Sequence, residues 1–152
     1  MAKSHVDPYA DDVLGSMLIV IHVMANLVWI GSIVSVGLLT AASSKLNDAT
    51  AAGLARGLYL RVAMPAFLVS FTFGASRLFL DPAYYMHLHW FHAKLTAVLV
   101  VIVLHHVIGG RARKVAAGSM QAGRTGGILV GALLACAFLS VACVLLKQSL
   151  VP

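Results

Sequence analysis

From Val13 to Ala42 the chain reads VLGSMLIVIHVMANLVWIGSIVSVGLLTAA, without a single Asp, Glu, Lys or Arg. An α-helix needs about 20 mainly apolar residues to cross the hydrocarbon core of a bilayer. This stretch therefore predicts a transmembrane helix. Three further apolar stretches follow it, and the four together predict spans over residues 13–42, 58–80, 90–110 and 127–150.

The overall composition agrees with four spans. The chain is 61% hydrophobic and 11% charged, whereas a soluble domain carries about 25% charged residues. Open sheets and loops cannot face lipid, because their backbone polar groups would stay unpaired there. The spans account for most of the 152 residues and leave no room for a second domain. We therefore predict an all-α integral membrane protein, a four-transmembrane-helix bundle that forms a single membrane domain over residues 1–152.

The placement of charge predicts the orientation of the bundle. With four spans, the first and third connections share one side of the membrane, and short connections rich in Lys and Arg favour the cytoplasm. That side holds most of the basic residues, namely Lys45, Arg56, Arg61, Arg111, Arg113, Lys114 and Arg124. We expect the protein to lie in the inner (plasma) membrane of a bacterium, with both termini outside, in the periplasm. This topology accounts for the net charge of +6. The charge therefore requires no nucleic acid as a partner, and membrane lipids are the partners we expect.

The fourth predicted span carries two cysteines and a row of small residues. Cys136 and Cys143 stand two helical turns apart, ~10 Å along the axis, which is too far for a disulfide. Gly127, Gly131 and Ala135 recur at four-residue spacing. Small residues so placed let helix backbones approach closely. They serve either packing within the bundle or a homodimer, and the sequence leaves both open.

Polar residues inside the spans are the candidates for function, because each is costly in lipid and usually faces the bundle interior. In the first span His22 lies ~12 Å from the outer end and shares a helix face with Asn26 and Trp29. An imidazole at that depth needs a partner. That partner is either a serine or carbonyl of another helix, or a ligand or proton, and we favour the second reading because other titratable groups are expected to converge on His22.

The third predicted span offers Lys94 and, eleven residues later on the same helix face, His105. Lys94 lies ~6 Å from the outer boundary, where a lysine either extends to the headgroups or takes part in a site. Straight helices would bring His22 close to Lys94 or His92.

The depth of His105 is ~22 Å, which differs from that of His22. The same count therefore places His105 close to Arg61 and Met64 of the second span. A pairing of His22 with His105 requires tilted helices and is not the arrangement that depth favours.

Histidines also cluster outside the spans. His87, His89 and His92 stand in the outer connection, within YYMHLHWFH. That spacing is compatible with a metal site, but histidines and aromatic residues also favour the membrane interface, and the sequence leaves both interpretations open.

Three motifs resemble those of a known family, the HemJ-type protoporphyrinogen oxidases, with the CopD copper-resistance membrane domains as more distant relatives. Residues 21–31, IHVMANLVWIG, resemble the histidine and Trp-x-Gly pair of that family. Residues 58–74, LYLRVAMPAFLVSFTFG, resemble its Arg-x-x-x-Pro segment with a later glycine. Residues 90–114, WFHAKLTAVLVVIVLHHVIGGRARK, resemble its Trp-x-x-x-Lys segment, with a later histidine and a basic tail. The motifs occur in the order of the family, one in each span.

The resemblance implies a membrane enzyme that binds haem b and oxidises protoporphyrinogen IX to protoporphyrin IX. By position, His22 and Lys94 match the essential residues of the family, and His105 and Arg61 are secondary matches. We expect His22 to be an axial ligand of the haem iron, and Lys94 or His105 to be the opposing metal ligand or a catalytic proton acceptor. We expect Arg61 and Arg77 to pair with propionates of haem or substrate, a role that suits guanidinium groups.

The chain departs from the family outside the spans. The first connection, TAASSKLNDATAAGLARG, lacks the Tyr-His pair of the family, and MQAGRTGGILVG lacks its Asn-Glu and proline. The resemblance therefore implies a haem b-binding membrane redox protein more directly than it implies porphyrinogen oxidation. Two alternatives stay open, a non-catalytic haem-binding or packing subunit of a larger respiratory or photosynthetic complex, and a CopD-like copper-handling protein.

Overall fold

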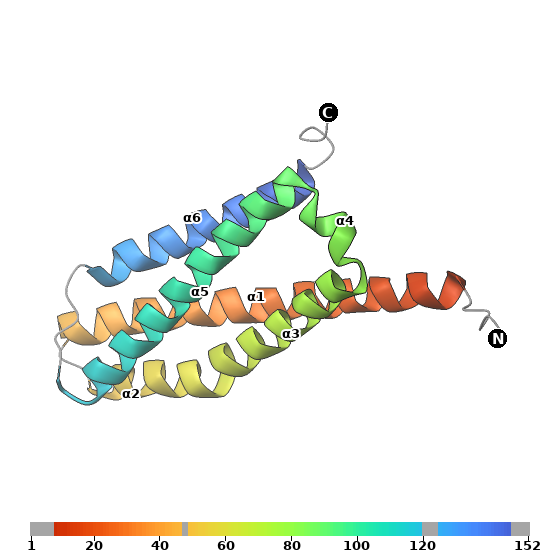
Figure 1. The fold of residues 1–152 in the computed structure, drawn as a ribbon. Coiled ribbons are helices and arrows are strands. Elements are labelled where there is room, and N and C mark those ends of the chain that lie inside the picture. The colour runs from red at the N-terminus through yellow and green to blue at the C-terminus, as the bar shows by residue number, and fades with distance from the viewer. Residues whose placement is uncertain (1–7, 47–48, 120–124, 147–152) are drawn as a thin grey trace.

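The computed structural model describes residues 8–46, 49–119 and 125–146, and these form helices joined by short turns (Figure 1). The elements are α1 (Pro8–Leu46), α2 (Ala49–Leu58), the π-helical segment η1 (Tyr59–Ala63), α3 (Met64–Leu80), α4 (Pro82–Met86), α5 (His89–Ala116) and α6 (Thr125–Leu145). Four stretches are long and apolar enough to cross a membrane: Val13–Ser43, Ala49–Leu80, His89–Ala116 and Thr125–Leu145. The prediction of an all-α bundle of four transmembrane helices is confirmed.

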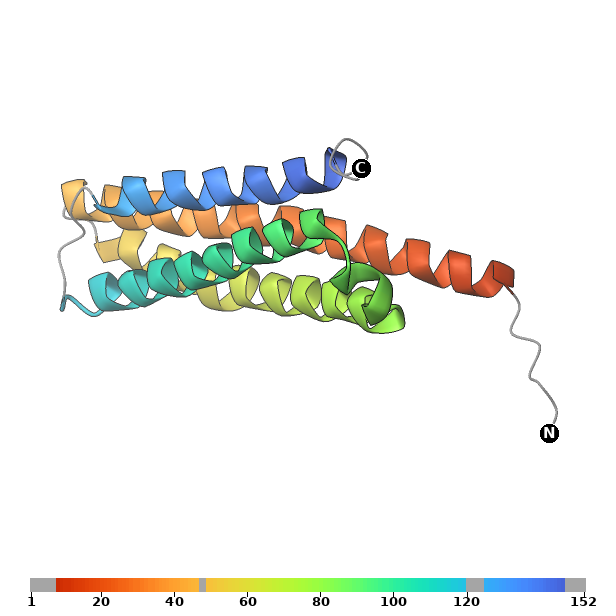
Figure 2. The same cartoon turned by 45° about the horizontal axis from the view of Figure 1, so that its top comes forward.

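The two ends of the bundle differ in charge and in what closes them. The start of α1, the short helix α4 and the end of α6 lie at one end, which we call the α4 end (Figures 1 and 2). The end of α1, the start of α2, the end of α5 and the start of α6 lie at the other, which we call the basic end. Among the described residues, the basic end carries Arg56, Arg111, Arg113 and Lys114.

Two helices extend beyond their predicted spans. The second membrane-crossing stretch begins at Ala49 rather than Leu58, because residues 49–58, ATAAGLARGL, are rich in alanine, the best helix former. The third continues to Ala116 rather than ending at residue 110, so its basic residues lie in the last turns of α5 and not in a loop. Cations are favourable at a helix C-terminus. The fourth ends at Leu145, and the predicted end at residue 150 lies outside the described residues.

A π-helical turn marks the join between α2 and α3. Pro65 has no backbone N–H, and its ring would clash with the carbonyl four residues earlier, at Arg61. The chain widens there instead, and the backbone N–H of Met64 bonds the carbonyl of Tyr59, five residues earlier. Such an insertion changes the direction of a helix and the faces its residues occupy. The bend between α2 and α3 is visible in Figure 1.

The core and the outer surface have the character of a protein in lipid. Ile33, Val36 and Leu133 are fully buried where α1, α5 and α6 meet. The outer face of α6 exposes large apolar side chains, for example Phe138 and Leu145, each 75% exposed. Exposure of apolar surface on this scale would be unfavourable in water, and a bilayer removes that cost.

Candidate functional site

The His22 ring bridges α1 and α3. Its Nδ1 lies 2.8 Å from the backbone oxygen of Ser70. A carbonyl only accepts, so Nδ1 carries the proton and donates it. In the neutral ring Nε2 is then the lone-pair nitrogen, and it accepts from Nδ2 of Asn26 at 3.0 Å. Asn26 also donates to the backbone oxygen of His22, at 3.0 Å. The ring is therefore oriented by α3, with its lone pair satisfied by one side-chain amide of its own helix.

Gly74 makes room for this ring. A Cβ atom at Gly74 would lie 2.7 Å from Cε1 and 2.8 Å from Nδ1 of His22, which is closer than real contacts allow. The backbone of α3 thus forms a flat floor beneath the imidazole. Gly74 ends the stretch of residues 58–74 that the sequence analysis singled out, and its contact with His22 gives this glycine a structural role.

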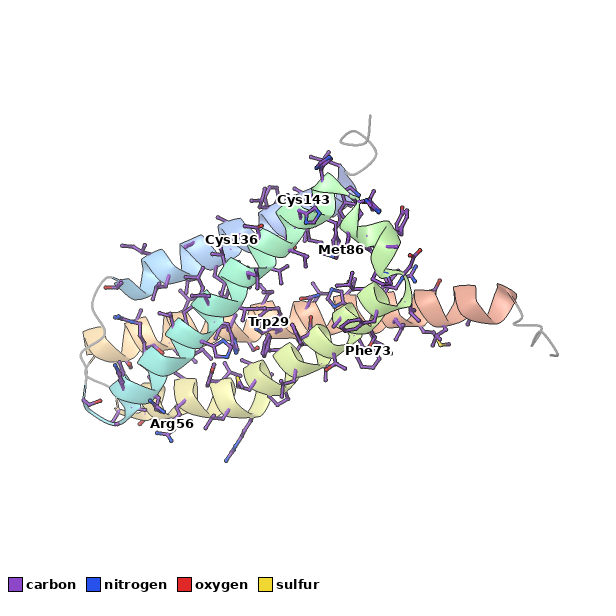
Figure 3. The ribbon with its side chains drawn as sticks, in the orientation of Figure 1. Trp29, Arg56, Phe73, Met86, Cys136 and Cys143 are labelled. Atoms are coloured by element: carbon purple, nitrogen blue, oxygen red, sulfur yellow. The ribbon has the colours of Figure 1, made fainter. Side chains whose placement is uncertain are left out.

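The positive charge of Lys94 acts electrostatically on the His22 ring. It lies on α5, is partly buried, and is within electrostatic range of both His22 and Cys143. Figure 3 places Cys143 where α6 runs beside the start of α5. Within the described part of the chain, the Lys94 ammonium has neither a hydrogen-bond acceptor nor a carboxylate partner. This electrostatic interaction agrees with the predicted neighbourhood of His22 and Lys94, but no hydrogen bond joins the two side chains among the described residues.

Arg77 lies one turn of α3 beyond Gly74, toward the α4 end. Its guanidinium packs over Gly15 of α1, with the carbon and one terminal nitrogen each 3.5 Å from the position of a Cβ there. Its Nε is buried and has no hydrogen-bond partner among the described residues. A buried N–H without an acceptor is costly, so Arg77 is the member of this region that most needs an anionic or carbonyl ligand.

His105 forms a separate cluster, one that the sequence predicted only in part. The ring is fully buried. Its Nδ1 accepts from the indole Nε1 of Trp29 at 3.0 Å, so in the neutral ring Nε2 carries the proton, which faces Sδ of Met64 at 3.3 Å. The rings of Trp29, Tyr59 and Phe67 surround it, with centroids 5.7, 5.2 and 5.1 Å away. The predicted proximity of His105 to Met64 is confirmed.

The structure does not bring His105 or Arg61 to His22. Both ring nitrogens of His105 are engaged within the core, and Trp29 stands two turns along α1 from His22. Arg61 lies in η1 and is exposed, because the π-helical turn before Pro65 changes the face it occupies. The expected position of Arg61 beside His105 is therefore wrong. The indole of Trp29 contacts the His105 ring instead.

The bond between Trp29 and His105 is expected to contribute strongly to stability. The substitution Trp29→Phe leaves the buried Nδ1 without its donor, which should cost about 1–3 kcal/mol of unfolding free energy. Trp90→Phe is the matched control, because Trp90 is also buried but its indole N–H makes no hydrogen bond to a described residue. Thermal unfolding in detergent should show a clearly larger loss for Trp29→Phe. Equal losses would mean that ring volume, and not the hydrogen bond, matters at both sites.

The outer histidines do not converge. His87 and His89 are exposed, and Nε2 of His92 donates to the backbone oxygen of Met86 at 3.0 Å. Across residues 8–46, 49–119 and 125–146, no group of three or more His, Cys, Asp or Glu side chains is placed to hold a metal ion. Cys136 and Cys143 are both free thiols, as their separation along the helix predicts.

Compared with protein-family models, with characterised protein sequences and with solved structures, the chain matches none of them.

Proposed function

We propose that this chain is a haem b-binding redox protein of the membrane, with His22 as an axial ligand. The observation that carries the proposal is the state of the His22 ring. A ligating histidine almost always donates its other N–H to a carbonyl or carboxylate, which fixes the tautomer and the ring orientation. His22 has this arrangement, with Nδ1–H on the Ser70 carbonyl and Nε2 held only by the Asn26 amide.

The residues around His22 fit a bound porphyrin in three respects. Nε2 becomes available when the Asn26 side chain rotates, and no backbone needs to move for that. Gly74 lets the ring pack closely against the backbone of α3, which helps to hold it in one orientation. Arg77, with its unpaired buried Nε, lies one turn away and suits a propionate. His105 fits less well, because both of its nitrogens already have partners.

The most specific activity within this proposal is oxidation of protoporphyrinogen IX to protoporphyrin IX. The oxidation removes electrons from the substrate, and haem b, when bound, would pass them one at a time to a membrane electron acceptor. The oxidation also releases protons from the substrate, and these need a base. Lys94 suits that role, because its amine is partly buried on α5 near His22 and the described residues offer it no carboxylate. In its neutral form Nζ takes up a proton, and Arg77 holds a substrate carboxylate.

The exposed small residues of α6 favour a second candidate function. In this candidate the chain is a non-catalytic haem-binding or packing subunit of a larger respiratory or photosynthetic complex. Gly127, Gly131 and Ala135 are all exposed, and a Cβ at either glycine would meet nothing within 4 Å. The row of small residues is thus not used inside this bundle. It suits close packing against another membrane helix, from a second copy or from a partner subunit. Co-purification of a partner protein in a mild detergent tests this candidate.

The copper-handling alternative lacks a ligand set in the described part of the chain, and nothing in the geometry favours it over haem.

We further propose that the basic end faces the cytoplasm and that the α4 end faces the periplasm, in the inner membrane of a bacterium. The reason is that basic residues gather at the basic end, namely Arg56, Arg111, Arg113 and Lys114, and such residues favour the cytoplasmic side. In a Cys136→Ala/Cys143→Ala background, an impermeant maleimide applied to intact cells should label Ala83→Cys. It should label Ser119→Cys only after lysis. Both positions are exposed in the bundle, so the opposite pattern would mean that the protein is inserted the other way.

A further inference from the structure

A cavity of about 290 Å³ opens at the basic end between α2–η1 and α5. Its walls include Arg56, Tyr59, Leu60, His106, Gly110 and Arg113. Figure 3 shows the place of Arg56 on α2 at this end. The roles proposed for His22, Lys94 and Arg77 do not use this cavity.

The cavity is positively charged without compensation from the described residues. Arg56 lies in the last turn of α2 and Arg113 in the last turn of α5. Among the side chains that the structure describes, the only carboxylate is that of Asp81, which caps α4 at the opposite end of the bundle. Two guanidinium groups on neighbouring helices therefore face one space, and no described residue places an anion there.

The other walls are suited to a ligand with one charged and one apolar part. Gly110 presents no side chain, and a Cβ there would meet nothing within 4 Å, so the cavity is open at that point. His106 donates Nδ1–H to the carbonyl of Ile102 at 2.8 Å, which leaves Nε2 for a ligand. Leu60 is 54% exposed and continues the cavity onto the apolar outer surface. The Tyr59 ring packs against Gly109 and forms the inner wall.

We infer that this cavity binds the phosphate of an anionic phospholipid headgroup, with Arg56 and Arg113 as the phosphate ligands. Guanidinium groups recognise phosphate by paired charge-assisted hydrogen bonds, and basic pockets between transmembrane helices at one membrane face take anionic headgroups. The apolar edge at Leu60 is where the acyl chains of such a lipid would leave toward the bilayer. A free phosphate would use the arginines but not that edge. The inference does not depend on the proposed haem site.

The test is titration of the delipidated protein in detergent with phosphatidylglycerol, followed by native mass spectrometry. The double variant Arg56→Gln/Arg113→Gln should weaken apparent lipid affinity by about tenfold or more, because charge-assisted hydrogen bonds are lost. The matched control is Arg111→Gln/Lys114→Gln. It also removes two positive charges from the basic end, but neither residue lines the cavity. The control should bind within about twofold of the parent, because neither side chain lines the cavity.

Three outcomes would overturn the inference. Equal weakening in both double variants would mean that the whole basic end attracts anionic lipid and that no pocket is involved. Equal affinity of the parent for phosphatidylcholine, whose choline cation neutralises its phosphate, would mean that the net negative charge of the headgroup is not recognised. Displacement of the lipid by inorganic phosphate at low millimolar concentration would assign the cavity to free phosphate. Haem content, measured in the same preparations, should be unchanged in both double variants.

Discussion

Replacement of His22 by alanine is expected to abolish haem retention while the protein still inserts in the membrane. The reason is that the proposed iron ligand is Nε2 of this ring, which the Ser70 carbonyl orients through Nδ1. Alanine removes both nitrogens and leaves a void above Gly74, but it adds no charge and keeps the helix. Haem content per chain and the absorption spectrum of the purified variant measure the effect.

Two control variants make this result specific. His87→Ala removes an exposed histidine of the α4 end and should leave haem content unchanged. Asn26→Ala removes the only side chain that holds Nε2, so the ligand becomes more accessible and haem should be retained. If His22→Ala keeps a full haem complement with an unaltered spectrum, His22 is a structural histidine whose function is the hydrogen bond between α1 and α3.

Substitution of Lys94 by arginine is expected to reduce protoporphyrinogen oxidation by about 10²-fold or more, the usual contribution of a proton-transfer group. A lysine that takes a proton must first lose its own, whereas the guanidinium of arginine stays protonated in proteins. The substitution keeps the positive charge and similar length, so it separates proton transfer from electrostatic anchoring. Rates are measured with purified protein and an added membrane-soluble electron acceptor, corrected for spontaneous oxidation of the substrate.

Lys114→Arg is the control, because Lys114 is an exposed residue in the last turn of α5 at the basic end. It should leave the rate unchanged. The haem spectrum of Lys94→Arg adds a second readout, since an altered spectrum at unaltered haem content would make Lys94 the opposing axial ligand. A variant that equals the parent in rate and in spectrum would make Lys94 a membrane anchor, and the subunit candidate would then be preferred.

Hydropathy alone predicted the four spans, because a bilayer imposes length and apolarity on each helix. Counting depth along the helices also placed His105 with Met64, since the rise per residue is fixed. Helix ends were less predictable. The alanine-rich stretch from Ala49 contains no long apolar run, and only helix propensity reveals that it continues the second span.

The contacts between helices could not be read from the sequence, because periodicity gives a face on one helix but not its rotation against another. Trp29 was assigned to the face of His22, yet its indole N–H bonds His105. A buried indole generally finds an acceptor, and that was the available signal. The π-helical turn before Pro65 also moved Arg61 to the surface, and a proline within a helical pattern indicates such a shift without giving its direction.

Binding of haem b by this chain is tested most directly by the absorption spectrum of the purified parent protein. A pyridine haemochrome assay and iron analysis accompany the spectrum. The protein is expressed in cells supplied with a haem precursor and purified in mild detergent. We predict b-type bands that shift between the oxidised and reduced states, with haem and iron present in equal amounts. A colourless preparation that contains folded, inserted protein and takes up no haem when titrated with it would contradict the claim.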